Sequence, residues 1–299
     1  MRKLWLMCVA VICASTGVME AGWTTLDAPG AQSTSPLDIY GTQVVGNYYD
    51  GAASHGFIYD SGAWTTLDKP GAVETIVCGT DGSRIVGGFY NGSTYQAFAY
   101  NGSSWTSFAV AGATSTCARD VYGSLIVGTY QMAAGAPIHG FIYDGTTWTY
   151  LDYSGAVITY PWSIHGTEIV GMYADGSAYH PFIYDSGSWT ILPDARGAAY
   201  TYAHGTDGSR IVGTSNNGST CHGLIYDSGS WTAFDAPGAT STQAYGIDGN
   251  RIAGYFSDGT QYHGFLYESD MSVVPVPGAS LLAGLGLGLA AWSRRRKSR

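Results

Sequence analysis

Short apolar runs alternate with short polar turns along most of the chain, and they return in the same order at a nearly constant interval. Apolar and aromatic residues dominate each run, as in strands that are buried on one face or both. In the last full copy the runs are Trp231–Asp235, Thr242–Ile247, Arg251–Phe256 and Tyr262–Tyr267. Asp-Gly pairs at 248–249 and 258–259 separate three of them, and such pairs favour tight hairpins because the central residues take positive φ. Each copy therefore predicts four short antiparallel strands.

The interval is set by six tryptophans, each followed by Thr and spaced by 41, 41, 43, 41 and 42 residues: Trp23, Trp64, Trp105, Trp148, Trp189 and Trp231. Such a period is typical of solenoids and propeller blades. The chain starts with an isolated fourth strand, Trp23–Asp27, and its last repeat ends with a third strand, His263–Glu268, which the first strand can complete. We therefore expect an all-β fold, a six-bladed β-propeller of four-stranded repeats closed by the N-terminal strand. An open β-solenoid array is the alternative.

The repeats share a framework of residues at equivalent positions, and we call each set of equivalent positions a column. Two further columns belong to this framework. One is a glycine that recurs at the same position of every repeat: Gly46, Gly87, Gly128, Gly171, Gly213 and Gly254. The other is apolar and, together with the tryptophans, predicts the core between blades: Phe57, Phe98, Phe141, Phe182, Leu224 and Phe265.

Composition narrows the class of protein. Only 12% of residues are charged, 14% are aromatic and 43 are Gly, which favours an all-β fold. Residues 22–270 hold six Lys and Arg against 21 Asp and Glu, a net charge near −15. Nucleic acid and anionic lipid are therefore poor partners for this region.

Both ends of the chain predict export. Residues 1–21 have the basic start, apolar run and small residues of a signal peptide. Residues 273–292 are long and apolar enough for a transmembrane helix, and the basic end 294–299 follows, which sets the tail on the cytoplasmic side. We expect residues 22–270 to be exported, at the cell envelope, either anchored in the membrane or extracellular after processing of the tail.

Residues 271–299 resemble the PEP-CTERM sorting tail of Gram-negative bacteria that make exopolysaccharide, because a Pro-containing motif precedes an apolar span and an Arg cluster. The sorting motif of this chain comprises Pro275, Val276, Pro277, Arg294, Arg295 and Arg296. Val276 stands where the family has Glu. The resemblance implies an exosortase-type processing enzyme as a partner; a plain C-terminal membrane anchor is the alternative.

The repeats are similar to the extracellular HAF repeat, named for its His-Ala-Phe core. In this chain the motif reads His-Gly-Phe or Gln96-Ala97-Phe98. The segments Ala244–Asp248 and Arg251–Gly254 occur in the same order as in the family. The resemblance covers about residues 23–268. It implies secretion and a repeat fold, and it supplies no catalytic residue.

Side chains with reactive groups give few signals. Five histidines share one column, two residues before the apolar Phe or Leu of the core, and we expect them to be structural, hydrogen-bonded to the turn or to the Thr after Trp: His55, His139, His180, His222 and His263. Residues 22–270 contain Cys78, Cys117 and Cys221, so at most one bridge, Cys78–Cys117, can form among them; two buried free thiols are the alternative. The sequence has no catalytic, metal-binding or cofactor motif, and we predict no catalytic residue, metal or cofactor.

A candidate binding site comes from positions where the copies differ, because the shared framework does not explain residues that vary. First strands are expected to run nearest the propeller axis, and two of their columns vary. In the later repeats these columns become aromatic, and the predicted binding residues are Arg119, Tyr160, Trp162, Tyr202, His204 and Tyr245. Aromatic rings beside hydrogen-bonding groups suit sugars. The alternative is that the rings only fill space between blades.

We expect a non-catalytic surface or matrix protein that binds extracellular polysaccharide. The competing prediction is a polysaccharide lyase or glycosidase on a propeller scaffold, which would need two carboxylates across a cleft. Among the inner columns only Asp38 and Asp120 are acidic.

Overall fold

The computed structural model describes residues 22–268, and every regular element within them is a β-strand. The strands are β1 (Trp23–Leu26), β2 (Ser33–Tyr40), β3 (Gln43–Tyr49), β4 (Ser54–Asp60), β5 (Ala63–Thr66), β6 (Glu74–Thr80), β7 (Ile85–Tyr90), β8 (Tyr95–Tyr100), β9 (Trp105–Phe108), β10 (Ser115–Tyr122), β11 (Leu125–Gln131), β12 (His139–Tyr143), β13 (Trp148–Leu151), β14 (Ile158–His165), β15 (Glu168–Ala174), β16 (Tyr179–Asp185), β17 (Ser188–Ile191), β18 (Tyr200–Thr206), β19 (Ile211–Asn216), β20 (Cys221–Asp227), β21 (Ser230–Phe234), β22 (Ser241–Asp248), β23 (Arg251–Ser257) and β24 (Tyr262–Glu268). The strands predicted for the last repeat are confirmed to within two residues.

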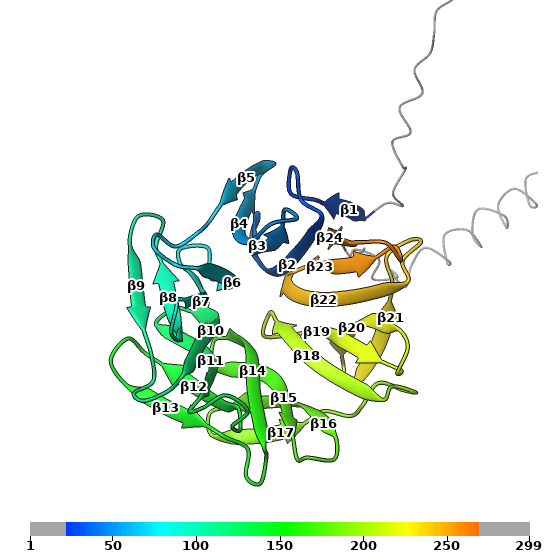
Figure 1. Cartoon of the computed structure of the whole chain (residues 1–299). Coiled ribbons are helices and arrows are strands. Elements are labelled where there is room, and N and C mark those ends of the chain that lie inside the picture. The colour runs from blue at the N-terminus through cyan, green and yellow to red at the C-terminus, as the bar shows by residue number, and fades with distance from the viewer. Residues whose placement is uncertain (1–21, 269–299) are drawn as a thin grey trace, which may run out of the picture.

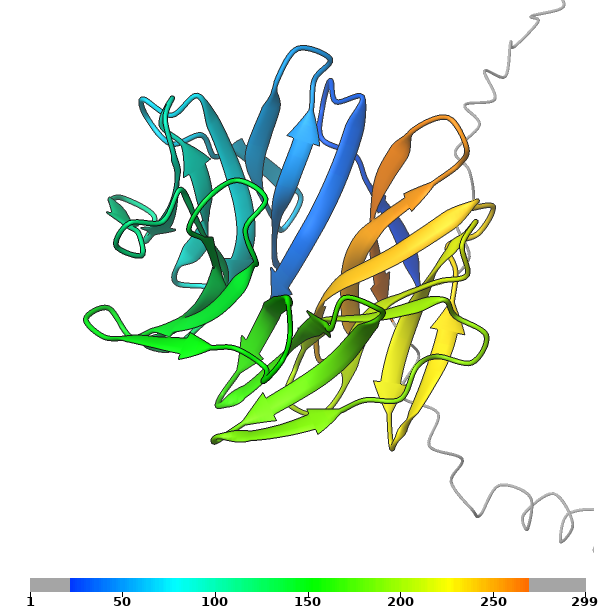
Figure 2. The same ribbon diagram turned by 60° about the horizontal axis from the view of Figure 1, so that its bottom comes forward.

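Consecutive strands pair antiparallel in runs of four, and the runs stand around a common centre as a β-propeller (Figure 1). β2, β6, β10, β14, β18 and β22 lie innermost in this view, and Figure 2 shows the sheets from a second direction. Four of the sheets are separate and four-stranded: β2–β5, β14–β17, β18–β21, and β22–β24 with β1. The propeller fold is confirmed.

The prediction of six separate blades is wrong in one respect. The runs β6–β9 and β10–β13 belong to one eight-stranded sheet, because β10 also pairs with β8 in parallel through a single residue pair, Ser115 and Tyr95. The Tyr95 amide donates to the Thr114 carbonyl 3.2 Å away beside this contact. One residue pair leaves no periodic trace in a sequence, so the repeat pattern did not reveal it.

The N-terminal strand closes the last sheet, as predicted. β1 pairs antiparallel with β24 from Trp23 opposite Tyr267 to Leu26 opposite Gly264. Leu26 is 3% exposed and packs in one cluster with Ile39 and Phe57 of the first repeat and with Leu266 of the last. This cluster joins the two ends of the repeat array, which argues against an open solenoid.

The predicted core columns differ in burial. The Phe column is fully buried, between 0% and 1% exposed, as is Leu224 at 1%. The tryptophans are only partly buried and pack against these rings; Trp105, for example, meets Phe98 edge to face with centroids 4.8 Å apart. The phenylalanine column thus forms the interior of the core and the tryptophan column its outer cover.

Several predictions fall outside the described residues: the signal peptide 1–21, the transmembrane segment 273–292 and the sorting motif of the tail. Residues 22–268 contain no helix long and apolar enough to cross a membrane.

Candidate ligand-binding site at the axis

Six residues at equivalent positions of the first strands line one cavity at the centre of the propeller: Leu37, Cys78, Arg119, Trp162, His204 and Tyr245. These residues form one of the two varying columns predicted to face the axis. Asp38, Asp120 and Ser163, each next in the chain to one of the six, line the cavity as well.

A β-bulge in every first strand turns these side chains inward. In each pairing of a first with a second strand, the register shifts at the column residue; Arg119, for example, is the extra residue between Ala118 and Asp120. Bulges commonly re-aim a side chain in this way. The bulge also explains the framework glycines, because a Cβ on Gly87 would collide with the Ile76 carbonyl oxygen, and the other five sites are equally tight.

The aromatic members of the predicted site pack on one another. His204 stacks on Tyr245 with centroids 4.2 Å apart and planes at 4°, and Trp162 meets His204 edge to face at 5.0 Å. Tyr160 lies 4.5 Å from Trp162, and Tyr202 stacks on His204 at 5.9 Å. The structure therefore brings all five predicted rings into one connected group.

Arg119 covers one side of this group. Its guanidinium carbon lies 4.7 Å from the Tyr160 centroid and 5.3 Å from that of Trp162, which are cation–π distances. Arg119 Nε and Trp162 Nε1 are buried and have no hydrogen-bond partner. Two donors of the predicted site thus remain available to an acceptor.

Burial sets the charge state of the other site residues. It lowers the pKa of His204 to about 4, so the ring is neutral at pH 7 and its Nδ1–H donates to the Ala244 carbonyl oxygen 2.9 Å away. It raises the pKa of Tyr160 to about 12 and that of Tyr245 well above its ordinary value. At neutral pH these residues therefore offer neutral rings and hydroxyls.

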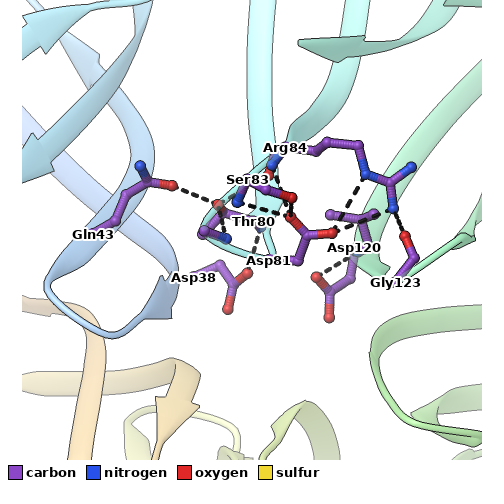
Figure 3. A network of polar contacts seen from close by, with 10 residues as sticks. Asp38, Gln43, Thr80, Asp81, Ser83, Arg84, Asp120 and Gly123 are labelled. Carbon is purple, nitrogen blue, oxygen red and sulfur yellow. Dashed lines mark hydrogen bonds and ion pairs between the residues drawn. The ribbon is translucent and has the colours of Figure 1, made fainter. Parts of the chain in front are cut away.

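The carboxylates of Asp38 and Asp120 accept hydrogen bonds from the first strand of the next repeat. The Thr80 amide donates to Asp38 Oδ2 at 2.7 Å (Figure 3), and the Ile164 amide and Ser163 hydroxyl donate to Asp120 Oδ2 at 2.8 and 2.7 Å. Burial raises the pKa of Asp120 to about 7; burial, and then the charge of Asp120, raise that of Asp38 well above its ordinary value. Both carboxyls are thus engaged in joining one first strand to the next.

The axial cavity is small. It encloses about 20 Å³ of free space. A single water needs roughly 10–15 Å³ of such space, so a sugar ring does not fit between the column residues as they stand. A larger ligand must contact the mouth of the axis.

Tyrosines that the sequence reasoning did not select extend the group to the surface at the end where the first strands begin. Tyr179 contacts Tyr202 at 5.7 Å and Tyr200 at 5.2 Å, and Tyr200 is 38% exposed. On the neighbouring repeat Tyr255 contacts Tyr245 at 5.3 Å and the 49% exposed Tyr262 at 5.6 Å. We call Tyr179, Tyr200, Tyr202, Tyr255 and Tyr262 the tyrosine rim. No sequence signal singles it out, because tyrosines stand at strand ends in the first three repeats as well, for example Tyr49, Tyr90 and Tyr95.

The histidine column has a structural role, as predicted, but its main partner was missed. His55 Nδ1 lies 2.7 Å from Asp68, the fourth residue after Trp64, and His139, His222 and His263 repeat this pair with Asp152, Asp235 and Asp27. The turn before the third strand supplies a second partner to His55 and His263. It also supplies a partner to His180, whose Nε2 lies 3.4 Å from Asp175. The main partner is thus the Asp four residues after Trp, where we had expected the Thr directly after Trp. His263 and Asp27 connect the last repeat to the N-terminal segment.

No family model matches the sequence, and no curated protein matches it either. Among solved structures, TolB from Acinetobacter baumannii is similar with a TM-score of 0.51 and 15% identity, over 77% of this chain and 64% of TolB. The β-propeller domain of the Trilobed protease from Pyrococcus furiosus, described as having an open velcro topology, gives 0.51 and 13%, over 80% of this chain and 83% of that domain.

The shared feature is the β-propeller fold. At these identities the similarity says nothing of activity. A peptidase's propeller domain stands beside TolB among the similar structures, so the fold does not decide whether this chain is an enzyme. The resemblances to PEP-CTERM tails and HAF repeats stay predictions.

Proposed function

We propose that this chain is an exported, non-catalytic module of the cell envelope whose propeller binds extracellular polysaccharide through the aromatic mouth of the axis. In this proposal the eight-stranded sheet works as two blades, so that six repeats surround the site. The C-terminal tail holds the protein in the membrane or is processed by an exosortase-type enzyme.

The proposal rests on a continuous series of side-chain contacts. The series begins with Arg119 at the axis, continues through aromatic rings and ends with the exposed Tyr200 and Tyr262 at the surface. The equivalent columns in the first two repeats hold Ser35, Leu37, Ile76 and Cys78, so the framework does not require rings there. Exposed aromatic faces flanked by hydroxyls suit the C–H faces and hydroxyls of sugars.

Because the axial cavity is too small for a sugar ring, we propose the tyrosine rim as the contact surface for the sugar. Trp162 and His204 lie beneath, where they fix the positions of Tyr202 and Tyr245. The hydroxyls of Tyr245 and Tyr255 lie 3.2 Å apart and both reach Gln243 Oε1, at 3.3 and 3.2 Å, which gives a polar group beside the rings.

A glycan array screened with the full-length protein, wild type beside Trp162→Ala, tests the proposal. We expect binding to a polysaccharide, weakened in the variant by on the order of 1–3 kcal/mol, because Trp162 supports the rings above it. No binder on a broad array would refute the proposal. Unchanged binding with reduced stability would show that Trp162 only fills the core.

The carboxyl groups that line the cavity are the one observation in favour of a carbohydrate-active enzyme, because a pKa of about 7 at Asp120 suits a general acid. The hydrogen bonds of Asp120 to Ser163 and Ile164 and the lack of room for a sugar favour the structural role. Release of reducing ends from polysaccharide by the wild type, lost in Asp120→Asn, would establish the enzyme instead.

A further inference from the structure

Two buried thiols meet beside the axis on different repeats. Cys78 of β6 and Cys117 of β10 are 6% and 8% exposed, and their Sγ atoms lie 4.0 Å apart. Both are free, and Cys78 lines the axial cavity. The distance is about 2 Å longer than a disulfide bond, so the two sulfur atoms must move closer together before a bond can form.

Arg119 favours the reactive form of this pair. Its Nη1 lies 3.8 Å from Cys78 Sγ, and its Nε has no hydrogen-bond partner. The hydrogen bond with Cys78, opposed by burial and helped by the charge of Arg119, lowers the pKa of Cys117 to about 6. The hydrogen bond with Cys117, and then burial, raise the pKa of Cys78 well above its ordinary value, so Cys117 is the thiol that becomes a thiolate. The thiolate is the form that reacts with oxidants.

The position of the pair gives a bond between the thiols a structural effect. The strands β6 and β10 are not neighbours in their common sheet. The two halves of that sheet pair their backbones where Ser115 lies opposite Tyr95, and they also pack through side chains such as Val86 and Ala118. A covalent link at the axis would close a loop between positions 39 residues apart. It would also remove the thiol group that now contacts Arg119.

We propose that Cys78 and Cys117 form a reversible disulfide that joins the second and third repeats at the axis. Hydrogen peroxide is an oxidant of suitable size, since the cavity admits a water-sized molecule. One thiolate attacks a peroxide oxygen, which gives a sulfenic acid and releases hydroxide. The second thiol then attacks the first sulfur, so that the S–S bond forms while the S–O bond of the sulfenic acid breaks. The departing hydroxide takes up the proton of the second thiol and leaves as water. Two thiols are oxidised and one peroxide is reduced.

The test compares full-length protein before and after peroxide, with thiols alkylated under denaturing conditions and the peptides identified by mass spectrometry. We expect a cross-linked peptide pair containing Cys78 and Cys117, cleaved by dithiothreitol, and a melting temperature raised by on the order of 5–10 °C after oxidation. Cys221→Ser is the matched control and should keep both effects. Cys117→Ser and Cys117→Ala should lose both.

Because each variant is compared with and without oxidant, a constant loss of stability from the substitution does not disturb the result. The proposal is refuted if Cys78 and Cys117 remain alkylatable after peroxide, or if they are oxidised separately without a cross-link. An oxidation-dependent shift that persists in both Cys117 variants would also refute it.

Discussion

Replacing Leu26 with Ala tests whether the N-terminal strand closes the propeller. Leu26 is 3% exposed and packs with Ile39, Phe57 and Leu266 in the cluster that joins the first and last repeats. Truncating a buried Leu costs about 2–5 kcal/mol, from lost burial and from the cavity that remains. For a domain of this size that corresponds to a fall of about 5–15 °C in melting temperature.

Leu67→Ala is the matched control. Leu67 occupies the equivalent position one repeat later, is 6% exposed and packs with Val45, Val77 and Phe98 between repeats that are continuous in the chain. Urea unfolding followed by tryptophan fluorescence should give similar losses for the two variants. A loss under about 1 kcal/mol for Leu26→Ala, beside a full loss for Leu67→Ala, would contradict closure by β1.

Two further predictions concern pH. Burial lowers the pKa of His263, but its hydrogen bonds with Asp27 and Asp258 outweigh burial and raise it. The pair with Asp27 therefore adds stability that is fully present below about pH 6.5 and is lost as pH rises through the folded-state pKa, so His263→Gln should lower the melting temperature more at pH 5.5 than at pH 8.5. A difference independent of pH would refute this. Asp120 has a folded-state pKa raised to about 7 by burial, so its contribution is fully present below about pH 4 and is lost as pH rises through 7. The stability of wild type relative to Asp120→Asn should fall by on the order of 1–3 kcal/mol between pH 5 and pH 8, and a constant or rising difference in chemical denaturation would show that the carboxyl is not protonated in the fold.

The repeat pattern was sufficient to predict the strands, the buried Phe57 column and the pairing of β1 with β24, because these depend on periodicity and on where the chain begins its repeat. It also predicted that residues such as Trp162 face the axis. The only sign of the β-bulge at Trp162 in the sequence was the glycine that recurs in every repeat. The repeat pattern could not predict the backbone pairing at Ser115 or the hydrogen bonds that the Asp120 carboxylate accepts, because these contacts link residues far apart in the sequence.

The room available at the site could not be predicted either. The column from Leu37 to Tyr245 was expected to border a binding cavity, but the side chains nearly fill it and leave about 20 Å³. Side-chain packing in three dimensions decides such a volume, and the identity of the residues alone does not. The tyrosine rim likewise depends on ring contacts between strands, such as that of Tyr179 with Tyr200, which residue identities alone do not determine.

The most direct test of the account is the affinity of full-length protein for the polysaccharide found on the array, measured by titration calorimetry with Tyr200→Ala/Tyr262→Ala. Losing both exposed rings should weaken binding by about 1–3 kcal/mol, roughly 5- to 150-fold, with little change in melting temperature. Tyr40→Ala is the control, because Tyr40 is 48% exposed at the opposite end of a first strand, and it should bind like wild type. Equal affinity of all three proteins would contradict the claim that the tyrosine rim binds polysaccharide.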